Sequence, residues 1–491
     1  MNIVKRILLL GGLALFVLVA ILAIRTAVLT GSGNAHRLDV RTLPPAPRFD
    51  LDLAARHLGE AVRFRTVSHQ DPAEDEGAEW DRLHEWLAAS YPLAHGKLTR
   101  EIIDGRTLLY SWPGRTPALA PVVLMAHQDV VPVAPGSESD WHHAPFGGEL
   151  ADGAVWGRGA VDDKGSLVSI FEALEALARS GFVPDRTLIV VSGANEEVHG
   201  SGARAAAAAL LERGVHAEFV LDEGLIVLAR HPVTGGPVAL VGVAEKGYAT
   251  LSVTARAAGG HSSMPPPSSA VGTLALALGR MSRAESPPTL AGPTREMLET
   301  LAPIAPLAAR VAIANEWLLG PVLIDRVRAT PAGAAMLHTT MAFTMLSGSP
   351  KENVLPERAS ATINFRLMPG DASSAVLERT RAAVADLPVE VAFVSAPLEA
   401  SAVSATTSRG WSLVATLAAD VVKSPVAPAI MIGGTDARAL QPVASDIYRF
   451  QPIELADGEL AMLHGTDERM TTANLARAIT FYARLIEAAT R

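Results

Sequence analysis

Short apolar runs that each lead into polar residues recur along this chain, and they constrain its fold more than any other feature. Three of these runs lie at residues 121–126, 187–191 and 219–221, and their apolar, β-branched content is typical of buried strands. Between them, residues 163–180 have apolar side chains at helical spacing, and residues 203–213 are rich in Ala. Strands that alternate with helices predict an α/β fold with a largely parallel sheet, whose ligand sites lie at the carboxyl ends of the strands.

Five clusters of His, Asp and Glu stand where predicted strands end or helices begin. They are HQD at 127–129, GRGAVDDKG at 157–165, NEE at 195–197, LDEG at 221–224 and HGTDER at 464–469. In an extended chain residues i and i+2 face the same way, so His127 and Asp129 can act together. Each cluster alone also fits a helix cap or a solvated acidic loop. Together they would bring two His and at least three carboxylates to one sheet edge, and this ligand set suits zinc, cobalt or manganese.

Composition narrows the chemistry further. The 491 residues include no Cys, which excludes a disulfide framework, a thiolate metal site and a Cys nucleophile. With 42 Lys and Arg against 51 Asp and Glu, the net charge of −9 argues against a nucleic-acid binder, because phosphate neutralisation needs clustered basic residues. A metal site in this chain would therefore use only His and carboxylate ligands.

Residues 7–24 form an unbroken run of eighteen apolar residues near the N-terminus. As a helix, this run would nearly span a hydrocarbon core of ~30 Å, and we predict a transmembrane anchor over 7–28, followed by a linker over 29–50. The alternative is a cleaved signal peptide, whose apolar region usually runs ~7–15 residues and ends at a small-x-small site. Lys5 and Arg6 precede the run, so the positive-inside rule predicts an extracytoplasmic catalytic part, membrane-anchored or, after cleavage, secreted.

After Gly247 the pattern changes to strands that alternate apolar and polar residues, as half-exposed strands do. The predicted order of elements over residues 247–396 is β-α-β-β-α-β, the ferredoxin-like split motif, with a Pro- and Leu-rich insertion at 285–335. We therefore predict a catalytic domain in two parts, 51–246 and 397–491, which is interrupted by a smaller α+β domain.

The ordered motifs HQD, GRGAVDDKG, NEE, LDEG, GGHSSMP and HGTDER resemble those of the aminoacylase and glutamate-carboxypeptidase family of co-catalytic zinc hydrolases. Within that family the chain is most similar to the branch that contains Gly-X carboxypeptidase and the N-fatty-acyl-amino-acid hydrolases. The resemblance implies a zinc-peptidase-like catalytic domain with a central mixed, largely parallel sheet. It also implies a ferredoxin-like lid or dimerisation domain and two divalent metal ions, Zn²⁺ first, with Co²⁺ or Mn²⁺ as alternatives.

The same resemblance implies a role for each metal ligand. His127 and Asp222 would bind one ion, Glu197 and His464 would bind the other, and Asp162 would bridge the two. Family members often have a cis peptide bond after the bridging Asp, a costly state where no proline follows.

Other residues would assist the metal ions. Asp129 would orient His127, and Glu196 would take the proton from the metal-bridging water and deliver it to the leaving amine. His261, in GGHSSMP, matches a lid His that helps to stabilise the tetrahedral oxyanion, and in dimeric members it reaches the site from the neighbouring subunit. The alternative for His261 is a loop His without such a role.

Asn353 and Arg366 match lid positions that meet the polar end of the substrate. An Arg suits a terminal carboxylate because its planar fork binds both oxygens. Arg438, in GGTDAR, is a second candidate for the carboxylate, and each Arg has the alternative of a structural ion pair. The insertion at 285–335 leaves the usual homodimer open, because it could cover or replace the dimerisation edge.

We therefore predict a dizinc metallohydrolase that cleaves the amide bond of peptides or N-acyl amino acids that end in a free carboxylate. A lipophilic acyl group would suit the apolar insertion and the membrane location. One rival is an aminopeptidase of the same catalytic fold, which generally lacks the inserted lid and the carboxylate-binding Arg. The other is a non-catalytic binding protein that keeps the fold, although no predicted ligand or base is missing here.

Overall fold

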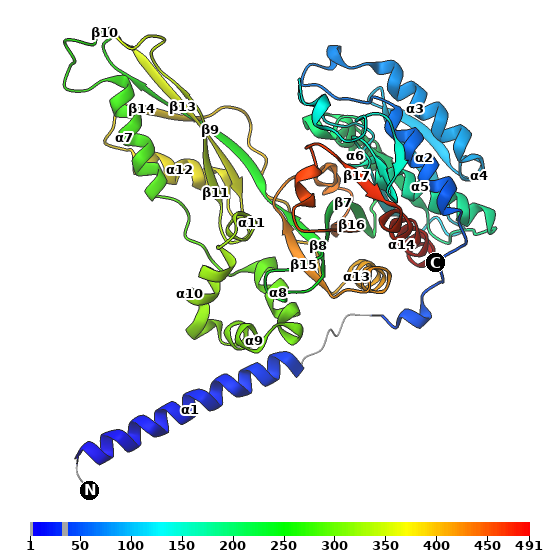
Figure 1. The fold of residues 1–491 in the computed structure, drawn as a ribbon, viewed down its shortest axis with the longest axis horizontal. Helices are drawn as coiled ribbons and strands as arrows, with labels where there is room; N and C mark the ends of the chain where they lie inside the picture. The colour runs from blue at the N-terminus through cyan, green and yellow to red at the C-terminus, as the bar shows by residue number, and fades with distance from the viewer. Residues whose placement is uncertain (1–2, 32–37) are drawn as a thin grey trace.

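The computed structural model describes residues 3–31 and 38–491 (Figure 1). Its largest sheet has eight strands, in the order β1 (Thr99–Ile103), β2 (Thr107–Trp112), β6 (Leu188–Ser192), β3 (Val122–Met125), β7 (Phe219–Leu228), β16 (Ile447–Leu455), β8 (Val238–Glu245) and β15 (Val426–Met431). The pairs β6–β3, β3–β7, β7–β16 and β8–β15 are parallel, whereas β1–β2, β2–β6 and β16–β8 are antiparallel. The central sheet is therefore mixed and mostly parallel at its centre, as predicted.

Helices cover both faces of this sheet. One face packs against α5 (Lys164–Arg179), α13 (Arg409–Val422) and α14 (Thr472–Thr490), with α2 (Leu51–Arg63), α3 (Gly77–Ser90) and α4 (Pro92–His95) around them. The other face packs against α6 (Gly202–Glu212) and the short helix η6 (Asp436–Leu440). Within β3, the side chain of Leu124 packs on the first of these faces, and those of Val123 and Met125 pack on the second. Burial on both faces explains why these strands are unbroken apolar runs.

A small sheet of three strands joins the C-terminal part of the chain to the segment that precedes α5. Its order is β17 (Arg469–Thr471), β5 (Ala154–Trp156) and β4 (Glu149–Ala151), all antiparallel. The HGTDER segment near the C-terminus is thereby held beside the GRGAVDDKG turn. Short 3₁₀ helices complete the connections, at η2 (Pro72–Glu74), η3 (Glu138–Asp140), η4 (Glu196–Val198) and η7 (Glu459–Met462).

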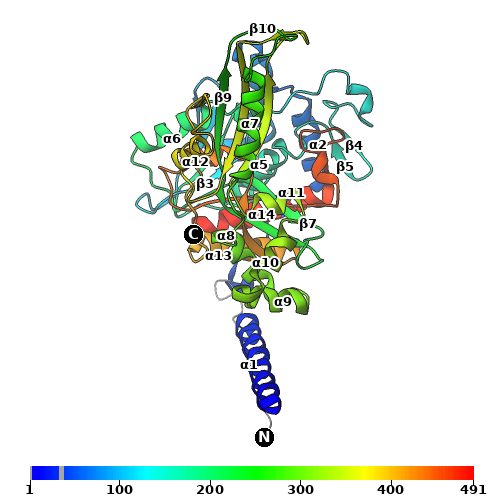
Figure 2. The same ribbon diagram turned by 90° about the vertical axis from the view of Figure 1, so that its left-hand side faces the viewer.

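A four-stranded antiparallel sheet forms a second, separate unit. Its order is β11 (Thr340–Ser347), β13 (Arg358–Leu367), β9 (Gly247–Arg256) and β14 (Val389–Phe393), and α7 (Ala270–Arg283) and α12 (Ser373–Ala383) cover one face. Along the chain the order is β9-α7-β11-β13-α12-β14. At its tip the short strands β10 (Gly260–His261) and β12 (Val354–Leu355) pair. Figure 2 shows this tip at the opposite end of the molecule from the N-terminal helix.

The insertion at 285–335 folds into five short helices: α8 (Gly292–Leu301), η5 (Ala302–Ile304), α9 (Leu307–Ala314), α10 (Glu316–Val327) and α11 (Pro331–Ala335). Apolar residues of α8, including Met297 and Leu298, pack with Val238 of β8 and Ala427 of β15. The insertion therefore covers the outer edge of the central sheet. β11, the outer strand of the four-stranded sheet, keeps most of its side chains exposed, so the insertion does not cover that edge.

The N-terminal apolar run lies within one long helix, α1 (Ile3–Gly31), which includes the whole segment predicted over 7–28. Its residues Lys5–Gly31, which contain a window of eighteen residues with a mean hydropathy of 3.1, are long and apolar enough to cross a membrane, by length and composition. Within the predicted linker, residues 32–37 lie outside the described residues. From residue 38 onward it contains the short helix η1 (Val40–Thr42) and then extended chain up to α2.

Candidate metal centre

Two groups of ligand-type side chains share one carboxylate, that of Asp162. Asp162 Oδ1 lies 2.9 Å from His127 Nε2, and Asp162 Oδ2 lies 3.1 Å from His464 Nε2. Glu197 Oε2 lies 3.1 Å from the same nitrogen of His464. The possible ligand atoms of each group lie within 4.8 Å of one another, and the groups are His127, Asp162 and Glu223, and Asp162, Glu197 and His464. A carboxylate with one oxygen in each group can bridge two cations.

Strand order explains why these side chains meet. β6, β3 and β7 are neighbours in the central sheet; Glu197 follows β6, His127 follows β3, and Glu223 lies in β7. Asp162 stands just before α5, and His464 lies between β16 and β17. The groups therefore gather at the carboxyl ends of parallel strands, the usual place for a ligand site in such a sheet.

A buried carboxylate from the far end of the chain holds the turn that presents Asp162. Glu468 accepts hydrogen bonds from the Arg158 guanidinium at 2.7 Å and from three backbone N–H groups within the turn 159–162 at 2.9–3.0 Å. Its side chain is fully buried. The peptide bond between Asp162 and Asp163 in this turn is cis.

We expect Glu468→Ala to lower the free energy of unfolding by about 3–5 kcal/mol, because it leaves the Arg158 guanidinium buried and unpaired. Burial raises the pKa of Glu468, which means that its charge is costly inside the protein, so the neutral Glu468→Gln should lose less. Chemical denaturation of the metal-free protein measures both, with Glu212→Ala on the exposed end of α6 as the control. A loss below about 1 kcal/mol in the Ala variant would contradict this role.

Asp222, the ligand predicted from the sequence, lies beside the two ligand groups but in neither of them. Its Oδ2 accepts a hydrogen bond from the backbone N–H of Ala437 at 2.9 Å, and its Oδ1 accepts one from the backbone N–H of Glu223 at 2.9 Å. Glu223, and not Asp222, lies with His127 and Asp162. Glu223 is therefore a second candidate for the ligand position predicted for Asp222.

Asp129 supports both His127 and the turn that carries Glu196 and Glu197, here called the Glu pair. His127 Nδ1 lies 2.9 Å from the backbone oxygen of Asp129 and 3.5 Å from its Oδ1. The Asp129 carboxylate accepts hydrogen bonds from the backbone N–H groups of Glu196 and Glu197, each at 3.1 Å, and from the Ser68 hydroxyl at 2.7 Å. The carbonyl of Asp129 thus makes the shorter contact with His127, while its carboxylate fixes the turn that carries Glu196.

The acidic side chains are buried close together, which makes the site suited to cations. Burial raises the pKa values of Glu196, Glu197 and Glu223, and neighbouring carboxylates raise them further. Among the described residues, Glu197 Oε1 is buried without a hydrogen-bond partner. Divalent cations would neutralise these charges and give that oxygen a partner, so the residues present fit a metal centre.

The two candidate Arg residues have different surroundings. Arg438 Nη2 lies 3.0 Å from Glu245 Oε2, so the ion-pair alternative is the arrangement observed for Arg438. The guanidinium of Arg366, in β13, stands 4.8 Å from the ring centre of Tyr248, and no carboxylate of the described residues forms an ion pair with it. The Tyr248 ring lies 6.4 Å from that of His199, in the loop of the Glu pair. Burial lowers the pKa of half-buried Arg366.

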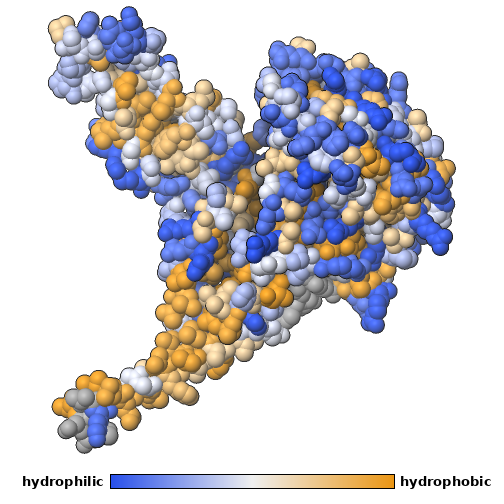
Figure 3. Space-filling model, in the orientation of Figure 1, coloured by the Kyte–Doolittle hydropathy of each residue, from blue (hydrophilic) through white to orange (hydrophobic). Residues whose placement is uncertain are grey.

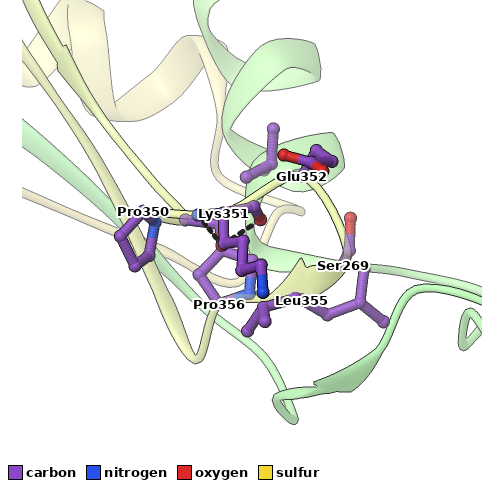
Figure 4. A pocket seen from close by; sticks show the side chains of 9 residues that line it. Ser269, Pro350, Lys351, Glu352, Leu355 and Pro356 are labelled. Carbon is purple, nitrogen blue, oxygen red and sulfur yellow. Dashed lines mark hydrogen bonds between the residues drawn. The ribbon is translucent and has the colours of Figure 1, made fainter.

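His261 and Asn353 lie at the tip of the four-stranded unit, at the end away from the central sheet (Figure 1). His261 is exposed, and its Nδ1 accepts a hydrogen bond from the backbone N–H of Ser263 at 3.1 Å. The carbonyl of Asn353 accepts one from the backbone N–H of Ser262 at 3.1 Å. Next to them lies an open cavity of 330 Å³. Figure 4 shows the residues that line it, among them Lys351. Within one chain, neither residue reaches the two ligand groups.

Sequence reasoning missed four residues that shape this site: Glu223, Glu468, Ser68 and Tyr248. Glu223 and Glu468 lie inside motifs that were recognised, LDEG and HGTDER. For Glu223 the signal was present, because it is the acid directly after the predicted ligand Asp222. Ser68 and Tyr248 carry no such signal, since their roles arise from contacts distant in sequence.

Known proteins resemble this chain in both sequence and fold. A family model described as Peptidase family M20/M25/M40 matches residues 123–488. The chain is 35% identical over 446 residues to a probable carboxypeptidase S-like 2 of Dictyostelium discoideum. This match covers 89% of this chain and 85% of the relative. The chain is also 33% identical over 483 residues to the N-fatty-acyl-amino acid synthase/hydrolase PM20D1 of Xenopus tropicalis. This second match covers 96% of this chain and 93% of the relative.

Solved structures share the fold at low sequence identity. The metallo-carboxypeptidase Sso-CP2 of Sulfolobus solfataricus superposes with a TM-score of 0.62 at 16% identity, over 89% of this chain and 98% of that one. Human carnosine dipeptidase 1 gives a TM-score of 0.61 at 15% identity, over 90% and 97% of the two chains.

Proposed function

The chain belongs to the M20/M25/M40 peptidase family, and on this premise we propose that it is a two-metal hydrolase. It cleaves the amide bond of peptides or N-acyl amino acids that end in a free carboxylate. One observation carries the proposal: Asp162 directs one carboxylate oxygen to His127 and the other to His464. The donor set of imidazole and carboxylate suits Zn²⁺ first, with Co²⁺ or Mn²⁺ as alternatives.

In the proposed catalytic step, Glu196 and Asp129 act beside the metal ligands. Bound divalent ions would supply a water of lowered pKa and polarise the substrate carbonyl. Glu196 takes the proton of the attacking water and returns it to the leaving amine. Asp129 fixes the backbone of Glu196 through its hydrogen bond at 3.1 Å. The proposed ligands are His127, Asp162, Glu197, Glu223 and His464, with Asp162 as the bridge.

The half-buried guanidinium of Arg366 is our choice for the substrate carboxylate. It lies over Tyr248 near the loop of the Glu pair and has no carboxylate partner among the described residues, whereas Arg438 is bound to Glu245. A charged group without a counter-ion in such a place can pair with a substrate anion through two parallel hydrogen bonds. This choice also favours a carboxypeptidase or amidohydrolase over an aminopeptidase, which has no need of that contact.

We expect Arg366→Ala to raise KM for an N-acyl amino acid by about 10–100-fold, because a hydrogen bond to a charged group is lost. The same variant should act equally on the free acid and on its methyl ester, whereas the wild-type chain should prefer the acid. Steady-state kinetics on both substrates measure this, with Arg179→Ala at the exposed end of α5 as the control. If the wild-type chain hydrolysed acid and ester equally well, the carboxylate contact would be refuted.

The relatives offer two substrate classes, and one experiment separates them. One is named a probable carboxypeptidase and another an N-fatty-acyl-amino acid synthase/hydrolase. We favour a lipophilic N-acyl amino acid, because the chain carries an apolar helix and an apolar insertion. Comparison of kcat/KM for N-oleoyl, N-acetyl and dipeptide substrates of the same C-terminal residue decides this, with bound metal measured in parallel. Equal values for all three would remove the preference for a long acyl chain.

We further propose that the four-stranded unit forms a homodimer that brings His261 and Asn353 to the partner's metal centre. Both residues lie at the exposed tip and do not reach the ligand groups of their own chain. The outer strand β11 offers an unpaired edge, with Phe343, Met345 and Leu346 exposed. An unpaired strand edge with apolar side chains is a typical surface for pairing with a second copy.

A mixture of two inactive variants tests the dimer directly. We expect Glu196→Ala and His261→Ala to be nearly inactive alone. In a 1:1 mixture that has exchanged subunits, each mixed dimer rebuilds one complete site, so activity should return to about a quarter of the wild-type value. Recovery that stays at the sum of the two separate activities would mean that His261 does not act across subunits.

We propose that α1 is retained as an anchor, with the catalytic unit outside the cytoplasm. Lys5 and Arg6 precede the apolar run, which sets this orientation. The end of α1 also bonds to the insertion, through Arg25 Nε to the Ala314 carbonyl at 3.0 Å and Asn315 Nδ2 to the Leu22 carbonyl at 3.2 Å. Cleavage as a signal peptide would remove these contacts and give a secreted protein.

A further inference from the structure

A set of exposed apolar side chains gathers on the insertion, next to α1. They lie on η5, at the start of α9 and on α10, and they are 43–67% exposed: Ile304, Leu307, Trp317, Leu318 and Val322, here called the insertion face. In Figure 3 the apolar surface of α1 continues onto the body at the place where Figure 1 shows α9 and α10. The insertion face is thus continuous with the one helix of the described residues that is able to cross a membrane.

The sequence of α10 is apolar on both of its sides. Trp317, Leu318 and Val322 point to the exposed side, while Gly320 and Leu323 on the opposite side are buried against the body. No charged residue stands between Glu316 and Asp325. A helix that is apolar all round belongs in a protein core or in contact with lipid, and only one side of α10 is covered by protein.

The contacts with α1 place the insertion face at the end of the apolar run. A stripe of α1, made of Leu18, Leu22, Thr26 and Leu29, is half-buried, and α9 packs against it. The hydrogen bonds of Ala314 and Asn315 reach α1 at Arg25 and Leu22. These contacts lie at the last turn of the apolar run 7–24, which would be ~27 Å long as a helix, close to the ~30 Å of a hydrocarbon core. Helices that contact α1 at the end of this run lie at the boundary between lipid and water.

We propose that the insertion face lies in the outer interface of the membrane, as a second, non-spanning contact beside α1. The inference rests on the proposed anchor. A helix that lies in the interface presents Leu, Phe or Trp to the acyl chains, and Trp is the residue that the interface favours most clearly. Asp325 and Arg328, which pair with each other at 2.7 Å, begin the polar end of α10 and stay in water. Two contacts with the membrane would fix the orientation of the catalytic unit above it.

The absence of Cys from the chain makes the test direct, because a single introduced thiol can be labelled without background. The full chain is reconstituted in phosphatidylcholine vesicles with an environment-sensitive fluorophore at Leu307→Cys or Val322→Cys. Val17→Cys in the middle of α1 reports the anchor, and Ile102→Cys, exposed on β1 at the opposite edge of the central sheet, reports water. Each variant must first show the wild-type rate of hydrolysis. Lipids with a spin label near the headgroup and aqueous iodide are the two quenchers.

We expect the lipid quencher to reduce the fluorescence at positions 307 and 322 at least threefold more than at 102, with iodide showing the reverse order. Iodide quenching at 307 and 322 equal to that at 102 would overturn the inference. Protection from both quenchers would overturn it too, because that result means contact with protein, such as a second copy. Position 17 tests the anchor by itself. If the lipid quencher acts at 17 but not at 307 and 322, the anchor stands and the interfacial contact is refuted. If it acts at 307 and 322 but not at 17, the anchor is refuted and the interfacial contact stands.

Discussion

Glu196→Gln is expected to lower kcat for amide hydrolysis by about 10²–10⁴-fold while the bound metal stays unchanged. The substitution keeps the size of the side chain but removes the group that accepts the proton of the attacking water. Glu196 belongs to neither group of possible ligand atoms, so metal content should not fall. The backbone N–H that Asp129 holds is also unaffected. Steady-state kinetics together with elemental analysis of the dialysed protein measure both quantities.

The control for this variant is Glu212→Gln, which makes the same chemical change at an exposed position on α6. It should hydrolyse the substrate at the wild-type rate. A Glu196→Gln chain that keeps kcat within about twofold of wild type would show that another group moves the proton. A Glu196→Gln chain without activity that also loses metal would mean that Glu196 acts as a ligand, contrary to our assignment.

The parts of the fold that follow from local pattern could be predicted from the sequence. The run at 121–126 predicted β3, because burial on both faces requires apolar residues at every position of Val122–Met125. The apolar side chains at helical spacing over 163–180 predicted a helix, and α5 spans Lys164–Arg179. Parallel strands that are connected through helices have their carboxyl ends at the same edge of the sheet, so residues that directly follow such strands lie close together.

What could not be predicted depends on contacts between distant residues. The insertion lies on β15 because apolar residues of that edge strand, such as Ala427 and Ala429, need cover, and no local pattern shows which surface an apolar helix will meet. The partner of Arg438, which lies in η6, is Glu245 at the end of β8. A sequence shows that an Arg and a Glu exist but not that they are adjacent, which is why both alternatives for Arg438 stood open.

Glu223→Ala and Asp222→Asn form a pair that tests which of these two carboxylates is the metal ligand. We expect Glu223→Ala to reduce the bound metal from two ions per chain to about one and to lower kcat/KM more than about 100-fold, because the loss of a direct ligand should exceed the 10–100-fold cost of changing its supporting residues. We expect Asp222→Asn to keep both ions, since Asp222 bonds to the backbone N–H groups of Ala437 and Glu223 and not to the ligand group. Equilibrium dialysis with elemental analysis reads out the stoichiometry.

Stability separates loss of metal from loss of fold in this pair. Burial raises the pKa of Glu223 well above its usual range, and Asp162 and Asp163 raise it further, so its charged form destabilises the metal-free protein at neutral pH. Glu223→Ala should therefore leave the melting temperature of the metal-free protein unchanged or higher, whereas Asp222→Asn should lower it, because an amide oxygen accepts less strongly than the carboxylate that now serves two backbone donors. If Asp222→Asn lost one ion and Glu223→Ala kept both, Asp222 would be the ligand, and our choice of Glu223 would be refuted.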